Sequence, residues 1–268
     1  MKFLITAISI VYTFSACSQK PDRGPGLQFS LFMNTPNWEI AQAVEKEDKI
    51  AIEALISHGK IDLNLREPQY GQTLLSLAVG NEKLISAKLL LEHGAKLNIK
   101  NKFGFEPIHD ASDAVNLNKK SYDMLELLLN NGANPNAEAF SKPEDTTSHS
   151  FVPLMGAVRN VKCAELLLAR GANLYYRHNE TYEVWVGLFN MEFDEEIFVA
   201  RYLIIDKKMP VPEIMLYTIP NHQPQTALKL LNEFNARGDK EKEKAKAEIL
   251  DYLKRIKYPQ KQVYKPIK

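Results

Sequence analysis

The residues of this chain that could carry out chemistry are few and lie far apart. Among its 268 residues there are six histidines and two cysteines. No two histidines have the i, i+4 spacing that holds a metal on one helix face, and there is neither a Gly-x-Ser-x-Gly motif nor a glycine loop for phosphate. Cys163 has no histidine motif beside it, and we interpret it as a buried apolar residue. We therefore predict no enzyme activity, no metal site and no cofactor.

The charge balance gives no reason to expect a nucleic acid partner. Lysine and arginine total 34 against 33 aspartates and glutamates, a formal net charge of +1, so no global field would attract a polyanion. Apolar residues make up 45% of the chain, which is typical of a folded protein. Two cysteines are too few for a disulfide framework.

A short apolar run precedes the first cysteine. Met1 and Lys2 supply one positive charge, and residues 3–14 form a mostly apolar stretch of 12 residues. Such a stretch is too short to cross a bilayer of about 30 Å as a helix. The pattern is typical of a signal peptide, which we assign to residues 1–16. The small residues Ser15 and Ala16 then precede Cys17, an arrangement that resembles the lipobox of bacterial lipoproteins.

The lipoprotein resemblance implies that Cys17 is acylated and becomes the mature N-terminus, anchored in a membrane. Phe14 stands where the motif usually has leucine, and ordinary signal cleavage nearby, with Cys17 incidental, is the alternative. Ser18 stands where an aspartate would retain the protein in the inner membrane. We therefore expect a bacterial envelope protein, attached to the outer membrane and facing the periplasm. Residues 17–34, which contain several prolines and glycines, are predicted to be a lipid-anchored tether.

A repeated motif sets the architecture of the rest of the chain. The sequence Leu-Leu-Leu-x-x-Gly-Ala begins at Leu89, Leu127 and Leu166, and a weaker copy begins at Leu55. Each apolar cluster is typical of a helix end, and the glycine after it suits a left-handed C-cap. A turn and a short apolar stretch with proline or a capping residue at its start precede each strong copy. Each unit is therefore predicted to contain a turn, a short helix, a longer helix and a glycine cap.

These units resemble the ankyrin repeat, whose consensus contains Gly-x-Thr-Pro-Leu-His-x-Ala and later Leu-Leu-x-x-Gly-Ala. The family period of about 33 residues matches the 33 residues from Gly71 to Gly104. The resemblance implies an all-α solenoid of four to five helix-turn-helix units over residues 35–206, with His109 bonded to the backbone of a neighbouring turn. The asparagines that match the family after the glycine cap are Asn64, Asn98 and Asn136.

The later units depart from the ankyrin pattern. The fourth finger turn, residues 137–150, is lengthened, and a fifth unit over residues 181–206 lacks the usual signature and cap, as terminal repeats often do.

Beyond the repeats, apolar periodicity predicts helices over residues 225–235 and 239–257. We interpret residues 207–257 as a helical C-terminal cap on the solenoid and residues 258–268 as a loose tail.

In ankyrin proteins the finger turns and adjoining first helices form a concave recognition surface, so the resemblance implies a protein partner. Carried over to this chain, the fingers are residues 65–70, 99–103, 137–150 and 175–180. Aromatic and arginine side chains dominate binding hot spots. The candidate partner-binding residues in these fingers are Arg66, Tyr70, Lys100, Phe103, Phe140, Tyr175, Tyr176, Arg177 and His178. Packing between fingers is the alternative role for the aromatic residues, evenly balanced for Phe103, whereas we expect Tyr176 and Arg177 to be exposed.

These features predict a non-enzymatic, lipid-anchored, monomeric scaffold that binds a protein partner. The resemblance to small bacterial ankyrin lipoproteins implies two possible roles for such a scaffold. One is immunity against a toxin, favoured by a lengthened finger suited to insertion into a cleft. The other is an accessory role, docking a periplasmic stress-protection enzyme. An enzyme is the least favoured alternative, because no catalytic motif is present.

Overall fold

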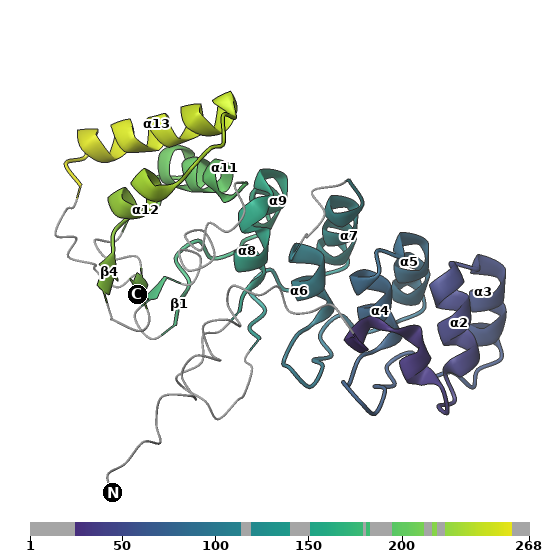
Figure 1. Cartoon of the computed structure of the whole chain (residues 1–268). Helices are drawn as coiled ribbons and strands as arrows, with labels where there is room; N and C mark the ends of the chain where they lie inside the picture. The colour runs from purple at the N-terminus through teal and green to yellow at the C-terminus, as the bar shows by residue number, and fades with distance from the viewer. Residues whose placement is uncertain are drawn as a thin grey trace, which may run out of the picture. The chain divides into compact units, whose positions relative to one another are not determined.

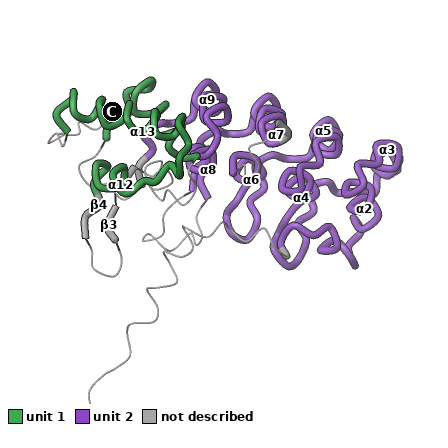
Figure 2. The backbone as a smooth tube through the Cα atoms, turned by 45° about the horizontal axis from the view of Figure 1, so that its top comes forward, with its two compact units in different colours: residues 1–24, 188–268 green, residues 25–187 purple. Residues whose placement is uncertain are grey.

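The chain was analysed as a computed structural model that describes residues 25–113, 119–139, 151–178, 181–182, 195–211, 216–218 and 223–258. Two compact units can be separated, one of residues 25–187 and one that contains residues 188–268 (Figure 2). None of the helices in the described ranges is both long and apolar enough to cross a membrane. Expected features that lie outside these ranges are the signal peptide, Cys17, Phe140 and residues 259–268.

The unit of residues 25–187 is built from helix pairs that follow one another along the chain (Figure 1). Neighbouring first helices pack together, and so do neighbouring second helices. This confirms the predicted all-α repeat architecture. The pairs are α2 (Trp38–Lys46) with α3 (Lys49–Ser57), α4 (Leu74–Gly80) with α5 (Leu84–Glu92), α6 (Pro107–Ser112) with α7 (Lys119–Asn130), and α8 (Pro153–Gly156) with α9 (Val161–Ala169).

Local signals fix where these helices begin and end. The Thr73 side chain accepts a hydrogen bond from the Ser76 amide and caps α4, while Pro153 occupies the first turn of α8. After α5 and α9, Gly94 and Gly171 take φ angles of 91° and 90°, a left-handed conformation that costs glycine little. The glycine cap predicted for each unit is therefore present.

The repeated leucines form the core of this unit. Leu90 of α5, Leu128 of α7 and Leu167 of α9 are fully buried. Full burial of such a side chain contributes about 1.5–3 kcal/mol. Cys163 of α9 is buried among them, as predicted. Packing within and between neighbouring pairs thus forms one apolar core, as in other repeat proteins.

Part of the segment expected to be a tether is folded onto the helices. Residues 25–33, which we call the N-terminal strap, contain the 3-10 helices η1 (Pro25–Leu27) and η2 (Phe29–Phe32). Phe29 and Phe32 are buried, and η2 packs against α2. The strap then reaches α4, where Asn81 Nδ2 donates to the Leu27 carbonyl at 2.8 Å. Composition alone indicated a linker, whereas these apolar side chains attach the segment to two repeats.

The second unit contains α11 (Glu196–Arg201), the π-helical turn η4 (Tyr202–Asp206), α12 (Ala227–Glu233) and α13 (Lys240–Arg255). The last two match the predicted C-terminal helices, and the Asp239 side chain caps α13 by accepting from the amides of Glu241 and Lys242. Strands β3 (Leu216–Thr218) and β4 (Gln223–Gln225) form an antiparallel pair in which Leu216 lies opposite Gln225. Tyr258, expected to begin a loose tail, is buried, and its hydroxyl accepts from the Ala227 amide at 3.4 Å.

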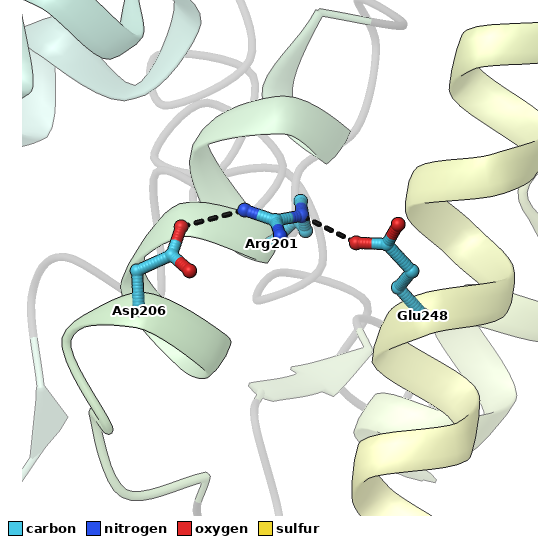
Figure 3. Close-up of polar contacts among 3 residues, drawn as sticks. All are labelled: Arg201, Asp206 and Glu248. Carbon is cyan, nitrogen blue, oxygen red and sulfur yellow. Dashed lines mark hydrogen bonds and ion pairs between the residues drawn. The ribbon is translucent and has the colours of Figure 1, made fainter.

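Ion pairs connect α11 and η4 to α13. Arg201 Nε donates to Glu248 Oε2 at 2.6 Å, and Arg201 Nη1 donates to Asp206 Oδ2 at 2.6 Å (Figure 3). The hydrogen bond from Arg201 lowers the pKa of Glu248. The division at residues 187 and 188 consequently assigns α11 to the C-terminal unit, earlier than the boundary expected after residue 206.

Candidate protein-binding surface

One buried carboxylate organises the second finger, residues 65–70. Glu67 is buried, and its carboxylate accepts hydrogen bonds from the backbone amides of Gln69 (2.6 Å), Tyr70 (2.8 Å) and Gln72 (2.9 Å). The Glu67 amide donates in turn to the Gln72 carbonyl at 2.9 Å. Hydrogen bonds to a charged acceptor are stronger than neutral ones, so this network gives the finger a defined conformation.

A different residue type does the same in the third finger, residues 99–103. Asn101 is buried, and its Oδ1 accepts from the amides of Phe103 (2.9 Å) and Phe105 (3.0 Å). Its own amide donates to the Phe105 carbonyl at 2.9 Å. Glu67 and Asn101 therefore satisfy equivalent backbone donors. Neither residue was predicted from the sequence. The candidates there are side chains expected to be exposed at the finger tips, whereas Glu67 and Asn101 are buried and bond the finger backbone.

Successive fingers are bonded to one another. The Lys102 amide donates to the Tyr70 carbonyl at 2.8 Å, and Lys102 Nζ donates to the Pro68 carbonyl at 2.5 Å. Lys100 Nζ reaches forward to the carbonyl of Glu138 in the fourth finger at 2.8 Å. The second and third fingers are thus bonded to each other, and Lys100 joins the third finger to the described base of the fourth.

His109 lies beneath these fingers. Its Nδ1 accepts from the Glu106 amide at 3.0 Å, and its Nε2 donates to the Ala137 carbonyl at 3.0 Å, which corresponds to a neutral imidazole. Burial lowers the pKa of this histidine to about 4. The role implied by the ankyrin resemblance, a bond to the backbone of a neighbouring turn, is therefore observed.

The base of the lengthened fourth finger is closed. Ala139 and Phe151 exchange backbone hydrogen bonds of 2.9 and 2.8 Å across an antiparallel bridge. The Phe151 ring lies 5.7 Å from that of Phe105 and 6.0 Å from His109, measured between ring centroids. The two ends of the insertion are consequently held together above an aromatic cluster.

The asparagines after the glycine caps connect neighbouring units. Asn64 Oδ1 accepts from the Lys96 amide at 2.8 Å. Asn136 Oδ1 accepts from the Asn173 amide at 2.6 Å, and its Nδ2 donates to the Gly171 carbonyl at 2.9 Å. These positions therefore support the stacking and do not contribute to a tip. His58 is likewise structural, because its ring bonds the Ala54 carbonyl at the end of α3.

The candidate binding residues are distributed unevenly over the fingers. The rings of Tyr70 and Phe103 are stacked with centroids 6.2 Å apart and 28° between their planes, and Phe103 is 49% exposed. Arg66 and Lys100 of the same two fingers are exposed, and so is Lys102, which was not predicted from the sequence. These five residues from two fingers, Arg66, Tyr70, Lys100, Lys102 and Phe103, form what we call the finger-tip patch.

The fifth finger is described in part. Tyr175 is 37% exposed, whereas Tyr176, expected to be exposed, is half-buried. Arg177 and His178 form β1 (Arg177–His178), which pairs with β2 (Thr181–Tyr182). Strand pairing fixes the backbone of these two residues but places neither with the finger-tip patch.

Cys163, His58 and His109 are in structural positions. Burial raises the pKa of the Cys163 thiol to about 11, which disfavours the reactive thiolate. Within the described ranges, no group of three or more histidine, cysteine, aspartate or glutamate residues could hold a metal ion. What this surface presents is exposed aromatic and cationic side chains on a fixed backbone.

Comparison with known proteins places the repeats in a family. A family model of ankyrin repeats in three copies matches residues 40–139. An ankyrin repeat protein of fowlpox virus (strain NVSL) is 32% identical over 125 residues, which cover 47% of this chain and 35% of the viral protein. Neurogenic locus notch homolog protein 1 of Mus musculus is 28% identical over 171 residues, covering 53% of this chain and 6% of that protein. The chain therefore corresponds to a limited part of each relative.

Proposed function

Because residues 40–139 match a family model of ankyrin repeats, we propose that the chain is a lipid-anchored, monomeric scaffold that binds one protein partner through the finger-tip patch. Ankyrin repeats are protein-binding scaffolds and in general not enzymes. The observation that carries the proposal is the stacked Tyr70–Phe103 ring pair, in which Phe103 is 49% exposed and Tyr70 is half-buried, on two fingers whose backbones are bonded to each other. Aromatic side chains in such positions provide large contact areas at low entropic cost.

The rigidity of the fingers favours binding. Glu67 and Asn101 fix each finger internally, and the Lys102 amide joins them. A surface that is already ordered loses little conformational freedom when a partner docks, so more of the contact energy appears as affinity.

The binding proposal is tested by capture with matched variants. The full chain is used as bait against envelope extracts, and the recovered proteins are identified by mass spectrometry. Phe103→Ala should reduce recovery of the specific partner at least tenfold. Ile50→Ser is the control, because Ile50 of α3 is an apolar side chain exposed to 81% outside the fingers. Equal recovery with both variants would contradict binding through the patch.

We propose immunity against a toxin as the use of this scaffold, with the fourth finger entering a cleft of the partner. The paired residues Ala139 and Phe151 support this proposal, because they bring the ends of the insertion together above an ordered base. Replacing residues 140–150 by Asn-Gly, which suits a two-residue hairpin, keeps that pair. Cells that express the captured partner should be protected by the wild-type chain and not by the shortened one. A captured partner that is a harmless stress-protection enzyme would favour the accessory role instead.

The lipid anchor is proposed on Cys17 and tested independently. Cys17→Ala should abolish incorporation of labelled fatty acid and release the protein from the membrane fraction. Retention in the membrane fraction without the cysteine would contradict lipid anchoring, and would leave the binding proposal unaffected.

A further inference from the structure

We infer that the partner presents an acidic segment with an apolar side chain to the finger-tip patch. This inference rests on the proposed function and adds the chemistry of the partner. Three sets of observations support it: the strap occupies neighbouring surface, the cations of the patch are in excess, and their remaining hydrogen-bond donors are held in place.

The N-terminal strap limits where a partner can dock on the first two repeats. It contacts α2 through η2 and α4 through Leu27, so it crosses two adjacent first helices (Figure 1). The fit is close at Gly80, where an added Cβ would lie 2.6 Å from Leu27 Cδ2. The strap also reaches the second finger, because a Cβ on Gly26 would lie 3.9 Å from the Tyr70 ring. The protein's own chain thus covers the first helices beside this finger and leaves its tip accessible.

Cations are in excess at that tip. Arg66, Lys100 and Lys102 are exposed, while the carboxylate of Glu67 within the same fingers is buried and accepts three backbone amides. Glu106 and Glu138 lie on the adjoining segments and are only half-buried, and the charge of Lys100 partly offsets the rise that burial causes in the pKa of Glu106. The five residues of the patch carry three positive charges and no negative one. The chain as a whole has a net charge of +1, so this excess is a local property of the tip.

The cations are held in position and keep donors for a ligand. Lys100 and Lys102 each use Nζ to bond one backbone carbonyl, whereas an ammonium group has three donors. Arg66 uses Nε on the Gly71 carbonyl at 3.3 Å, and among the described residues its terminal nitrogens remain for a carboxylate, the group that guanidinium binds best. Tyr70 follows Arg66 in the second finger and Phe103 follows Lys102 in the third, and their stacked rings offer an apolar contact. A segment with two or more carboxylates and one aromatic or aliphatic residue satisfies both requirements.

Selection of peptides from a random library tests this inference while the partner is still unidentified. The immobilised full chain is used to select 12-residue peptides displayed on phage, and winning sequences are synthesised for affinity measurement. Enriched peptides should contain acidic residues next to an aromatic or aliphatic one. The triple variant Arg66→Glu, Lys100→Glu and Lys102→Glu should bind them at least tenfold more weakly. The triple variant Lys162→Glu, Lys229→Glu and Lys240→Glu has the same change in net charge at exposed sites elsewhere and should bind normally.

Several results would overturn the inference. These are enrichment of neutral or basic peptides, no enrichment at all, equal weakening by both triple variants, or binding of the patch to phosphatidylglycerol vesicles in place of peptides. Loss of partner capture by Phe103→Ala together with any of these would leave the proposed scaffold function in place while rejecting an acidic partner. Normal capture by Phe103→Ala would instead reject the function on which the inference rests.

Discussion

Protonation of His109 should destabilise the repeat unit as the pH falls from about 6.5 to about 4. The neutral ring accepts from the Glu106 amide and donates to the Ala137 carbonyl, so it joins α6 to the fourth finger. An imidazolium ion has no acceptor, so protonation loses the bond from the Glu106 amide, although Nδ1 also lies 3.1 Å from the Glu106 carbonyl. Burial of the ring is the main reason why the charged form is disfavoured.

The size of the effect follows from the two pKa values of the group. In the unfolded chain the histidine titrates near 6.5, while in the folded chain burial lowers its pKa to about 4. Between these values the unfolded state binds more protons, so the free energy of unfolding falls with falling pH. Stability is fully retained above about pH 6.5 and decreases until about pH 4. At about 1.4 kcal/mol for each pKa unit, the total loss is about 3 kcal/mol.

Urea unfolding followed by circular dichroism between pH 7.5 and pH 4 measures this loss. The wild-type chain is compared with His109→Gln, which cannot titrate at this position. Glu106, whose pKa is raised by burial, changes stability in the opposite direction near the lower end of the range. Because Glu106 is present in both proteins, the difference between them isolates His109.

Between pH 7.5 and pH 4, the free energy of unfolding should fall by about 3 kcal/mol more for the wild-type chain than for His109→Gln. His93→Gln, which removes an exposed histidine at the end of α5, is the control and should retain the wild-type pH dependence. Parallel stability curves for wild type and His109→Gln would refute the assignment of the titration to this buried ring.

Three further substitutions test the packing of the repeat unit. Gly156→Ala should lower the free energy of unfolding by about 1–3 kcal/mol through overpacking, because its Cβ would lie 2.8 Å from the backbone nitrogen of Asp113; an unchanged urea midpoint would contradict that contact. Glu67→Ala leaves three backbone amides without their acceptor and should cost about 1–3 kcal/mol or more, with hydrogen exchange accelerated in the second finger but not in α9. Leu128→Ala should cost about 2–5 kcal/mol in thermal or urea unfolding, since Leu128 is fully buried, and a loss below about 1 kcal/mol would show that the core tolerates the cavity.

The helix pairs could be predicted from the sequence because their signals are local and repeated. Leucine clusters beginning at Leu89, Leu127 and Leu166 have the same relation to a following glycine, and each unit supports the interpretation of the next. The same applies to α12 and α13, where apolar periodicity and the cap residue Asp239 lie within one helix length.

The N-terminal strap could not be predicted in the same way. Its prolines and glycines indicate a linker, and its apolar residues Leu27, Phe29 and Phe32 have no helical or strand periodicity. They are ordered by side chains far along the chain, as in the bond from Asn81 to Leu27, 54 positions apart. Contacts of that kind depend on how the repeats pack and leave no local pattern.

The finger-tip patch was predicted in part. The residue types selected Arg66, Tyr70, Lys100 and Phe103, but they favoured Tyr176, which is half-buried, and they omitted Lys102. Exposure at a tip depends on how the backbone of the finger is hydrogen-bonded internally. Glu67 accepts these bonds with a carboxylate and Asn101 with a side-chain amide oxygen, so no single residue type marks the position.

The amino-acid sequence by itself determined the repeat, the helix boundaries and the residues available at the fingers, because these depend on side chains within a few turns of one another. Only the tertiary structure decided which carboxylate is buried, which cations keep free donors and which first helices the strap covers. The bonds of Lys100 and Lys102 and the position of the strap are set by contacts between segments far apart in the sequence, and burial is a property of the packed chain that no single repeat contains.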